Sequence, residues 1–219
     1  MTVKVFTAVF NQEEAKMETV PQSQNKFSYL TPESDDEETV KAEVITDTLN
    51  ADDLYLNNSW ILWTHEVRNT DWKVESYKKV LELATVGDVL RIVNNFSRLD
   101  YRNYHYFVMR NGIDPTWEDS ANRYGGVCSF KTEINPVTQP KELSLIPVWN
   151  YFLQMITGET LFENMADING LSISPKNNWA IVKIWNRDKS NDIAELLPSS
   201  IKTKMAILSI KYKVNAPEY

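Results

Sequence analysis

The chain contains one cysteine, Cys128, and two histidines, His65 and His105, among its 219 residues. A single cysteine cannot form an intramolecular disulfide, and such scarcity is typical of proteins from a reducing compartment. A metal site needs clustered ligands, whereas these three residues are far apart in the sequence, so we expect them to have packing or surface roles. No apolar run approaches the roughly 18 residues of a membrane span, and the amino terminus lacks the features of a signal peptide. These absences predict a soluble, cytoplasmic protein.

Common catalytic and nucleotide-binding motifs are missing as well. The sequence contains no G-x-x-x-x-G-K-[ST], no G-x-G-x-x-G, no G-x-S-x-G and no H-E-x-x-H. We therefore expect a protein that is not an enzyme and that uses no cofactor and no metal.

The charge of the chain is unevenly distributed. The net charge is −7, which argues against binding an RNA backbone over the whole surface. Residues 1–50 hold 4 basic against 10 acidic residues, whereas residues 51–219 hold 19 against 20. We predict a flexible acidic arm over residues 1–50 and a folded domain over residues 51–219, where a local basic patch remains possible.

The whole chain has 42% hydrophobic residues, enough to build a core, and the periodicity after residue 50 predicts an α+β domain. The expected architecture is one antiparallel sheet with helices packed on one face. Asn111-Gly112 is a typical pair for a tight hairpin turn, and Pro198 is expected to interrupt the last helix. Strands are expected at 60–64, 76–83, 104–110, 127–132, 171–174, 180–185 and 206–212, and helices at 85–96, 143–157 and 191–202.

Seven tryptophans stand out in this sequence. Trp60, Trp63 and Trp149 occur in strongly apolar segments, so we interpret them as core residues. Trp72 and Trp117 are instead flanked by charged and turn-forming residues, where a fully buried indole is not expected. Two solvent-facing indoles beside a carboxylate could hold a flat cation or a base.

The motifs around these tryptophans extend from Leu56 to about Tyr212. They are Trp60-Ile61-Leu62-Trp63, Thr85-Val86-Gly87-Asp88, Gly112-Ile113-Asp114-Pro115-Thr116-Trp117-Glu118-Asp119, Gly125-Gly126, Gly158-Glu159 and Ile184-Trp185. In these motifs the chain resembles the eukaryotic translation initiation factor 4E family, which binds the 7-methylguanosine cap of messenger RNA. The resemblance implies a single curved antiparallel sheet with helices on its convex face and the cap site on its concave side.

The resemblance also implies a role for four side chains. The methylated guanine would stack between Trp72 and Trp117, and Glu118 would accept hydrogen bonds from its N1–H and N2–H groups. Trp185 would contact the methyl group. A carboxylate acceptor at this position also disfavours adenine.

The phosphate contacts depart from the family pattern. Lys176 fits one basic position of the family, but Ile181 stands where a second lysine is usual. Period-2 alternation places Lys183 on the same strand face as Ile181, so we expect Lys183, with Arg187, to bind the phosphates. By the same alternation, Trp179 lies on the strand face of Ile181 and Lys183. We interpret its indole either as a ring on which the first transcribed nucleotide stacks or as a wedge that closes its loop.

On the opposite, helix-bearing surface, the family binds a helix that belongs to a scaffold initiation factor or to repressor proteins. Here the corresponding positions are Val86, Leu90 and Tyr151, and Leu90 replaces the tryptophan that usually anchors the partner. Three hypotheses stay open: an initiation factor, a cap-binding repressor or competitor, and an interaction domain that has lost the cap. We expect a monomer in the cytoplasm, which for a divergent viral member would be the host cytoplasm.

Overall fold

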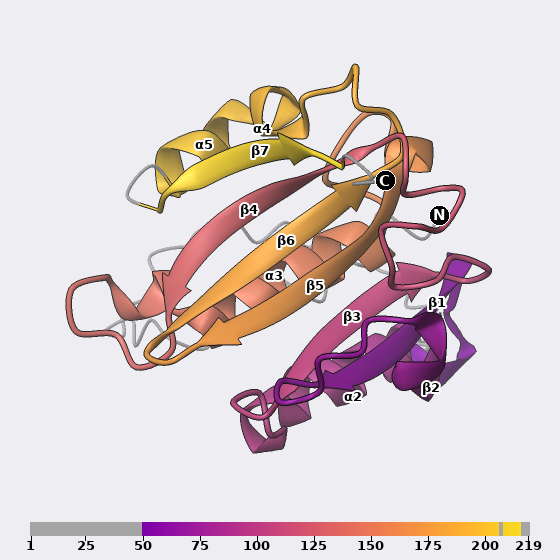
Figure 1. Ribbon diagram of the computed structural model, residues 1–219, viewed down its shortest axis with the longest axis horizontal. Helices are drawn as coiled ribbons and strands as arrows, with labels where there is room; N and C mark the ends of the chain where they lie inside the picture. The colour runs from indigo at the N-terminus through magenta and orange to yellow at the C-terminus, as the bar shows by residue number, and fades with distance from the viewer. Residues whose placement is uncertain (1–49, 206–207, 216–219) are drawn as a thin grey trace, which may run out of the picture.

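The computed structural model describes residues 50–205 and 208–215, so the predicted acidic arm lies outside the described residues except for Asn50. Its seven strands form one sheet in the order β2-β1-β3-β5-β6-β4-β7, and all neighbouring pairs are antiparallel (Figure 1). This confirms the predicted single antiparallel sheet. The strands are β1 (Tyr55–Glu66), β2 (Lys78–Thr85), β3 (Tyr104–Arg110), β4 (Gly126–Glu133), β5 (Ile168–Lys176), β6 (Trp179–Asn186) and β7 (Ile210–Val214).

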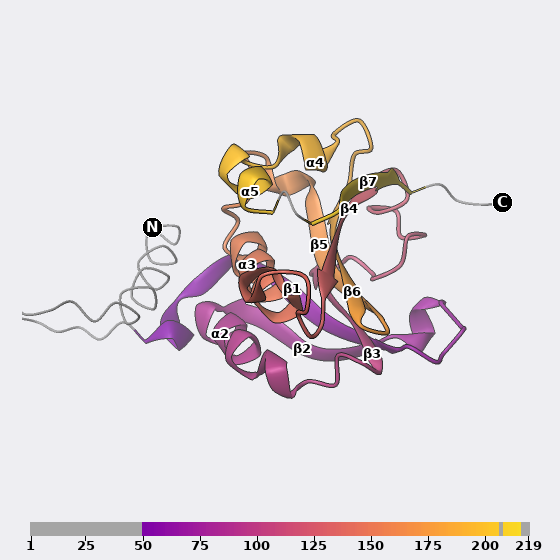
Figure 2. The same cartoon turned by 90° about the vertical axis from the view of Figure 1, so that its left-hand side faces the viewer.

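The four α-helices of the described residues lie on one face of the curved sheet, and the opposite face, which we call helix-free, carries no α-helix of those residues (Figure 2). They are α2 (Val86–Asn95), α3 (Leu145–Thr157), α4 (Ile193–Leu196) and α5 (Ser199–Lys204). As predicted, Pro198 separates the last two helices, because it cannot donate the backbone hydrogen bond that a continuous helix needs. No helix in the described part of the chain combines the length and apolarity needed to cross a bilayer.

The main core lies between the sheet and the helices. Helix α3 directs a fully buried apolar stripe at the sheet, with the spacing that the sequence predicted. Trp60 and Trp149 are 0% exposed in this core, which confirms their assignment. Members of the stripe with no exposed surface are Leu145, Trp149, Phe152, Leu153 and Ile156.

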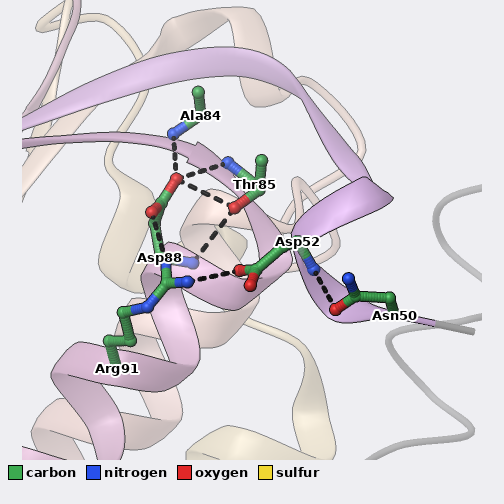
Figure 3. A network of polar contacts seen from close by, with 6 residues as sticks. All are labelled: Asn50, Asp52, Ala84, Thr85, Asp88 and Arg91. Atoms are coloured by element: carbon green, nitrogen blue, oxygen red, sulfur yellow. Dashed lines mark hydrogen bonds and ion pairs between the residues drawn. The ribbon is translucent and has the colours of Figure 1, made fainter.

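Helix α2 begins at the predicted capping box. The hydroxyl of Thr85 accepts from the Asp88 amide at 3.1 Å, and the Asp88 carboxylate accepts from the Thr85 amide at 2.9 Å (Figure 3). Arg91 then joins Asp88, at 2.7 Å, to Asp52 on the segment before β1, at 2.6 Å. These ion pairs are largely exposed, so each contributes on the order of 0.5 kcal/mol. Their main effect is to hold the start of the domain against α2.

The hairpin predicted at Asn111-Gly112 is wrong. Gly112 does adopt a positive φ of 86°, but Asn111 does not, and β3 pairs with β1 and β5 rather than with β4. The turn residues therefore bend the chain only locally. Residues 111–125 then form a long connection that carries the chain past β5 and β6 to β4, and this loop becomes part of the candidate site.

Candidate functional site

A second, smaller apolar cluster lies on the helix-free face of the sheet. Its strand positions alternate with those that face the main core, as a pleated strand requires. The cluster includes Trp185, which is 7% exposed and donates through Nε1 to the Ser172 hydroxyl at 2.9 Å. Trp117 is half-buried and packs against the same cluster. Its buried members are Ile61, Trp63, Tyr77, Phe107, Met109, Ile113 and Trp185. The fold therefore places Trp117 and Trp185, two of the residues selected from the sequence, at one site.

Trp72 lies in the connection between β1 and β2 and is 46% exposed. One face of its indole stacks on the imidazole of His65, with ring centroids 4.3 Å apart and an angle of 15° between the planes. The Nε2–H group of His65 donates to the Asp71 carbonyl at 2.7 Å, which fixes the loop beside the indole. Trp72 was predicted as a site residue from the sequence, but His65 was not, because an isolated histidine in a strand gives no indication that it stacks on another ring.

A pocket of about 570 Å³ opens between the two site loops. Trp72 and Glu118 both line it, whereas Trp117 lies on the adjacent apolar cluster. Within the described residues no ring contact joins Trp72 to Trp117; the rings around Trp72 belong to His65, Tyr77 and His105. The residues that line the pocket are Trp72, Lys73, Val74, Glu75, Asp114, Thr116, Glu118 and Asp119.

The carboxylate of Glu118 is exposed, and its negative charge acts on the phenol of Tyr77. Burial, and after it the negative charge of Glu118, raise the pKa of the Tyr77 phenol. Tyr77 belongs to the apolar cluster and lies 6.4 Å, centroid to centroid, from Trp72. An indole and a carboxylate therefore meet at this pocket, and Tyr77 links the indole to the neighbouring apolar cluster.

The loop that carries Trp117 and Glu118 is held by buried amides that the sequence analysis missed. Asn122 is 0% exposed and donates to the carbonyls of Asp114, at 3.0 Å, and Thr116, at 2.7 Å. Asn169, also fully buried, donates to the Asn122 side-chain oxygen at 3.0 Å and to the Ala121 carbonyl at 2.7 Å. These bonds fix the backbone on both sides of Trp117 without a regular element. Asparagine is a common turn residue, so its presence in a loop sequence does not indicate this role.

Strand β6 arranges basic and aromatic side chains along the helix-free face. Its residues Ala180, Val182 and Ile184 are buried in the main core, which confirms that Ile181 and Lys183 share the opposite face with Trp185. Lys183 lies in register between Ser172 on β5 and Ser129 on β4.

Lys183 belongs to a group of crowded positive charges. Burial lowers its pKa, and the charges of Lys176 and Lys213 lower it further. The pKa of His105 is lowered to about 4 by burial and then by His65, Lys183 and Lys176. Crowded cations of this kind attract an anion to the face that they line.

Arg187 is not among the charges that act on Lys183. It is exposed beyond the end of β6, and its backbone N–H donates to Asp167. The structure therefore groups Lys176 with Lys183 but does not bring Arg187 to them.

The opposite, helix-bearing face holds the residues selected for partner binding. Val86 is 2% exposed and can offer a partner little surface, whereas Leu90 and Tyr151 are half-buried. Tyr151 lies beside a pocket of about 440 Å³, and the Lys204 ammonium lies 5.4 Å from its ring centroid. Leu90 does not line this pocket. A larger cavity of about 790 Å³, between 160–168 and 191–198, contains none of the selected residues.

The described residues include no cluster of three or more histidine, cysteine or acidic side chains suited to a metal. Cys128 is fully buried, and burial, with Asp192, raises the pKa of its thiol to about 12. His65 and His105 are likewise buried, so all three residues have packing roles rather than surface roles.

Comparison with known proteins gives a consistent result. The family profile described as eukaryotic initiation factor 4E matches residues 55–218. The eukaryotic translation initiation factor 4E homolog of Acanthamoeba polyphaga mimivirus is 27% identical over 154 residues, covering 59% of this chain and about half, 54%, of that protein. Ascaris suum eIF4E-3, solved with an m7G cap, has a TM-score of 0.60 and 28% identity, covering 75% of this chain and 93% of that one. C. elegans eIF4E-3, solved with the 4E-binding protein Mextli and a cap analog, has a TM-score of 0.59 and 27% identity, covering 74% and 92%.

Proposed function

Because this chain belongs to the eukaryotic initiation factor 4E family, we propose that it binds the 7-methylguanosine cap of messenger RNA in the cytoplasm and acts in translation initiation. The observation that carries the proposal is the meeting of Trp72 and Glu118 at one pocket, beside the cluster that holds Trp117 and Trp185. It is further supported by relatives of this chain that were solved with an m7G cap and with a cap analog.

The chemistry of the pocket suits an alkylated purine. Methylation at N7 gives the guanine ring a delocalised positive charge, which favours stacking on electron-rich indoles. His65 covers one face of Trp72 and leaves the other for the ligand, and closure of Trp117 onto the opposite side of the base would complete the sandwich. Each indole face would contribute about 1–3 kcal/mol through dispersion and cation–π attraction.

Glu118 gives the pocket its base selectivity. Its exposed carboxylate can accept two hydrogen bonds from the N1–H and N2–H edge of guanine, and the backbone N–H of Trp117 can donate to O6. Adenine presents an unprotonated N1 at this edge, so the carboxylate would be left without a partner. Trp185 lies in the adjacent cluster and would contact the methyl group.

Lys176 and Lys183 would bind the triphosphate. Both are in the basic group on the helix-free face, where an anionic ligand would relieve their mutual repulsion. Arg187 is not part of this group, so we propose only a peripheral role for it.

Fluorescence titration with a cap analogue tests the proposal. Wild-type protein should show saturable quenching by 7-methyl-GTP and much weaker quenching by GTP. Trp72→Ala, Trp117→Ala and Glu118→Ala should each lower the affinity at least about fivefold, since each contact is worth roughly 1–3 kcal/mol. Tyr55→Ala is a matched control because this side chain is aromatic and 72% exposed but is remote in sequence from both site loops. Equal affinity for methylated and unmethylated nucleotides would refute the proposal.

A cap-binding repressor or competitor is the second candidate. It is favoured by the convex face, where Val86 is buried and Leu90 stands apart from the pocket beside Tyr151. Co-precipitation with a scaffold initiation factor, abolished by Leu90→Ala or Tyr151→Ala, would support the initiation role. Retained cap binding without scaffold capture would support the repressor role.

A further inference from the structure

Trp179 lies on the same face of β6 as Lys183 and Trp185, at the opposite end of the strand. The alternating residues Ala180 and Val182 point into the main core, so the orientation of Trp179 is fixed by the pleat. Trp179 and Trp185 are six positions apart, which corresponds to about 20 Å along a strand. Trp179 is half-buried, so part of its indole stays open to solvent.

Two lysines accompany this indole. The Lys131 ammonium of β4 lies 4.1 Å from the centroid of the Trp179 ring, and Lys176 of β5 is its direct cross-strand neighbour. The neighbour on β4 is Glu133, whose carboxylate accepts hydrogen bonds from the amides of Val137 and Thr138. The nearby carboxylate is therefore already engaged, whereas the lysines can contact another anion.

We propose that Trp179 is a stacking platform for the first transcribed nucleotide of a capped RNA, and that Lys131 and Lys176 contact the phosphates beside that base. This inference rests on the proposed function, because it assumes that the cap lies between Trp72 and Trp117. The order of side chains along β6 carries it. Trp185 lies at the methylguanine end, Lys183 follows about 7 Å along the strand, and Trp179 is last.

The same order occurs along the ligand, in which the methylated base, the triphosphate and the first nucleotide follow one another. A base stacked on an aromatic ring contributes about 1–3 kcal/mol and tolerates any sequence, because every base has a flat face. The ammonium of Lys131 covers part of the indole, so the base would use the open remainder. Lys176 acts on the charge of Lys183 and is also the cross-strand neighbour of Trp179, so it connects the basic group to this end of the strand.

The competing explanation is a purely structural one, in which Trp179 and Lys131 clamp the β5–β6 hairpin. The two explanations differ in what happens to RNA affinity. We would measure the Kd of the full-length chain for 7-methyl-GTP and for a short capped oligoribonucleotide, using wild type, Trp179→Ala and Trp179→Phe. Thermal melting of each variant monitors folding.

Wild type should bind the capped oligonucleotide about tenfold more tightly than the cap analogue, as one added stack predicts. Trp179→Ala should lose this gain and keep its affinity for the analogue, and Trp179→Phe should retain most of it. Lys131→Ala should reduce the extra affinity for the capped oligonucleotide and the salt dependence of that extra affinity. Lys204→Ala, on the helix-bearing face, should change neither.

The proposal is overturned if Trp179→Ala keeps the full gain or if wild type shows none. If Trp179→Ala fails to fold, the Lys131→Ala and Trp179→Phe variants decide. The proposal is then overturned if Lys131→Ala keeps the full extra affinity for the capped oligonucleotide, or if a folded Trp179→Phe has none of it. A failure of cap binding itself would be visible separately, because wild type would then not distinguish 7-methyl-GTP from GTP.

Discussion

The imidazole of His65 lies flat against the indole of Trp72, with 4.3 Å between the ring centroids. His65 is itself 1% exposed and bonded to the Asp71 carbonyl, whereas Trp72 remains 46% exposed. A buried, hydrogen-bonded ring thus supports an exposed one. Because the indole is already oriented, less conformational entropy is lost when a ligand stacks on its open face.

Replacing His65 tests whether this support matters for binding. His65→Ala removes the stack and the bond to Asp71, so we expect the affinity for 7-methyl-GTP to fall about tenfold, in line with roughly 1–1.5 kcal/mol for an aromatic pair. His65→Phe restores a flat ring and should retain most of the affinity. Fluorescence titration of both variants measures the effect. Wild-type affinity in His65→Ala would show that the histidine serves packing alone.

Asn122 should be needed for both the stability and the function of the loop that carries Trp117. Asn122→Ala leaves the carbonyls of Asp114 and Thr116 without their buried donor, which should cost about 2 kcal/mol of unfolding free energy. Since the loop backbone loses its anchor, affinity for the cap analogue should fall as well. Urea denaturation and ligand titration would be compared with Ser120→Ala, an exposed control in the same loop. If Asn122→Ala loses stability but keeps its affinity for the cap analogue, the expectation that Asn122 is needed for binding is contradicted.

Lys183 should distinguish phosphate binding from base binding. Lys183→Ala should weaken binding of 7-methyl-GTP about tenfold, the effect of losing a charge-assisted contact of roughly 1.5 kcal/mol. Binding of the bare 7-methylguanosine nucleoside should change little, because it has no phosphate. Isothermal titration of both ligands gives the comparison, and Lys141→Ala provides an exposed lysine away from the site. Equal losses for the two ligands would refute the assignment.

Much of this fold could be predicted from the sequence because its signals are local. The capping box at Thr85 and the apolar stripe of α3 each depend on residues within a few turns of one helix. Alternation along β6 placed Ile181, Lys183 and Trp185 on one face for the same reason. The hairpin at Asn111-Gly112 failed because a turn sequence specifies a bend but not which strand follows as a neighbour.

The candidate site was only partly predictable. Trp72, Trp117, Glu118 and Trp185 were selected from motifs, and three elements of the fold bring them to one face. His65 and the buried pair Asn122 and Asn169 were missed, because their roles depend on contacts between segments far apart in the chain. Arg187 was selected by proximity in sequence, and the strand ends before it.

His105 should make the folded state sensitive to acid. Its pKa is lowered to about 4 by burial and by the neighbouring His65, Lys183 and Lys176, whereas an unfolded histidine titrates near its ordinary value of about 6.5. Between these two values the unfolded chain binds more protons than the folded chain, so stability rises with pH across this window and is lost as pH falls from about 6.5 to about 4.

The expected loss attributable to His105 is roughly 2–3 kcal/mol at the acidic end of that window. Urea denaturation at several pH values would measure it, with His105→Phe as the control, because phenylalanine fills the same buried space without a titrating group. Carboxylates that titrate below about pH 5 act in both proteins and cancel in the difference. The wild-type stability should therefore decline more steeply than that of His105→Phe as pH falls from neutrality. Parallel curves would mean that the imidazole takes up its proton without penalty, so that His105 is more hydrated than its 6% exposure indicates.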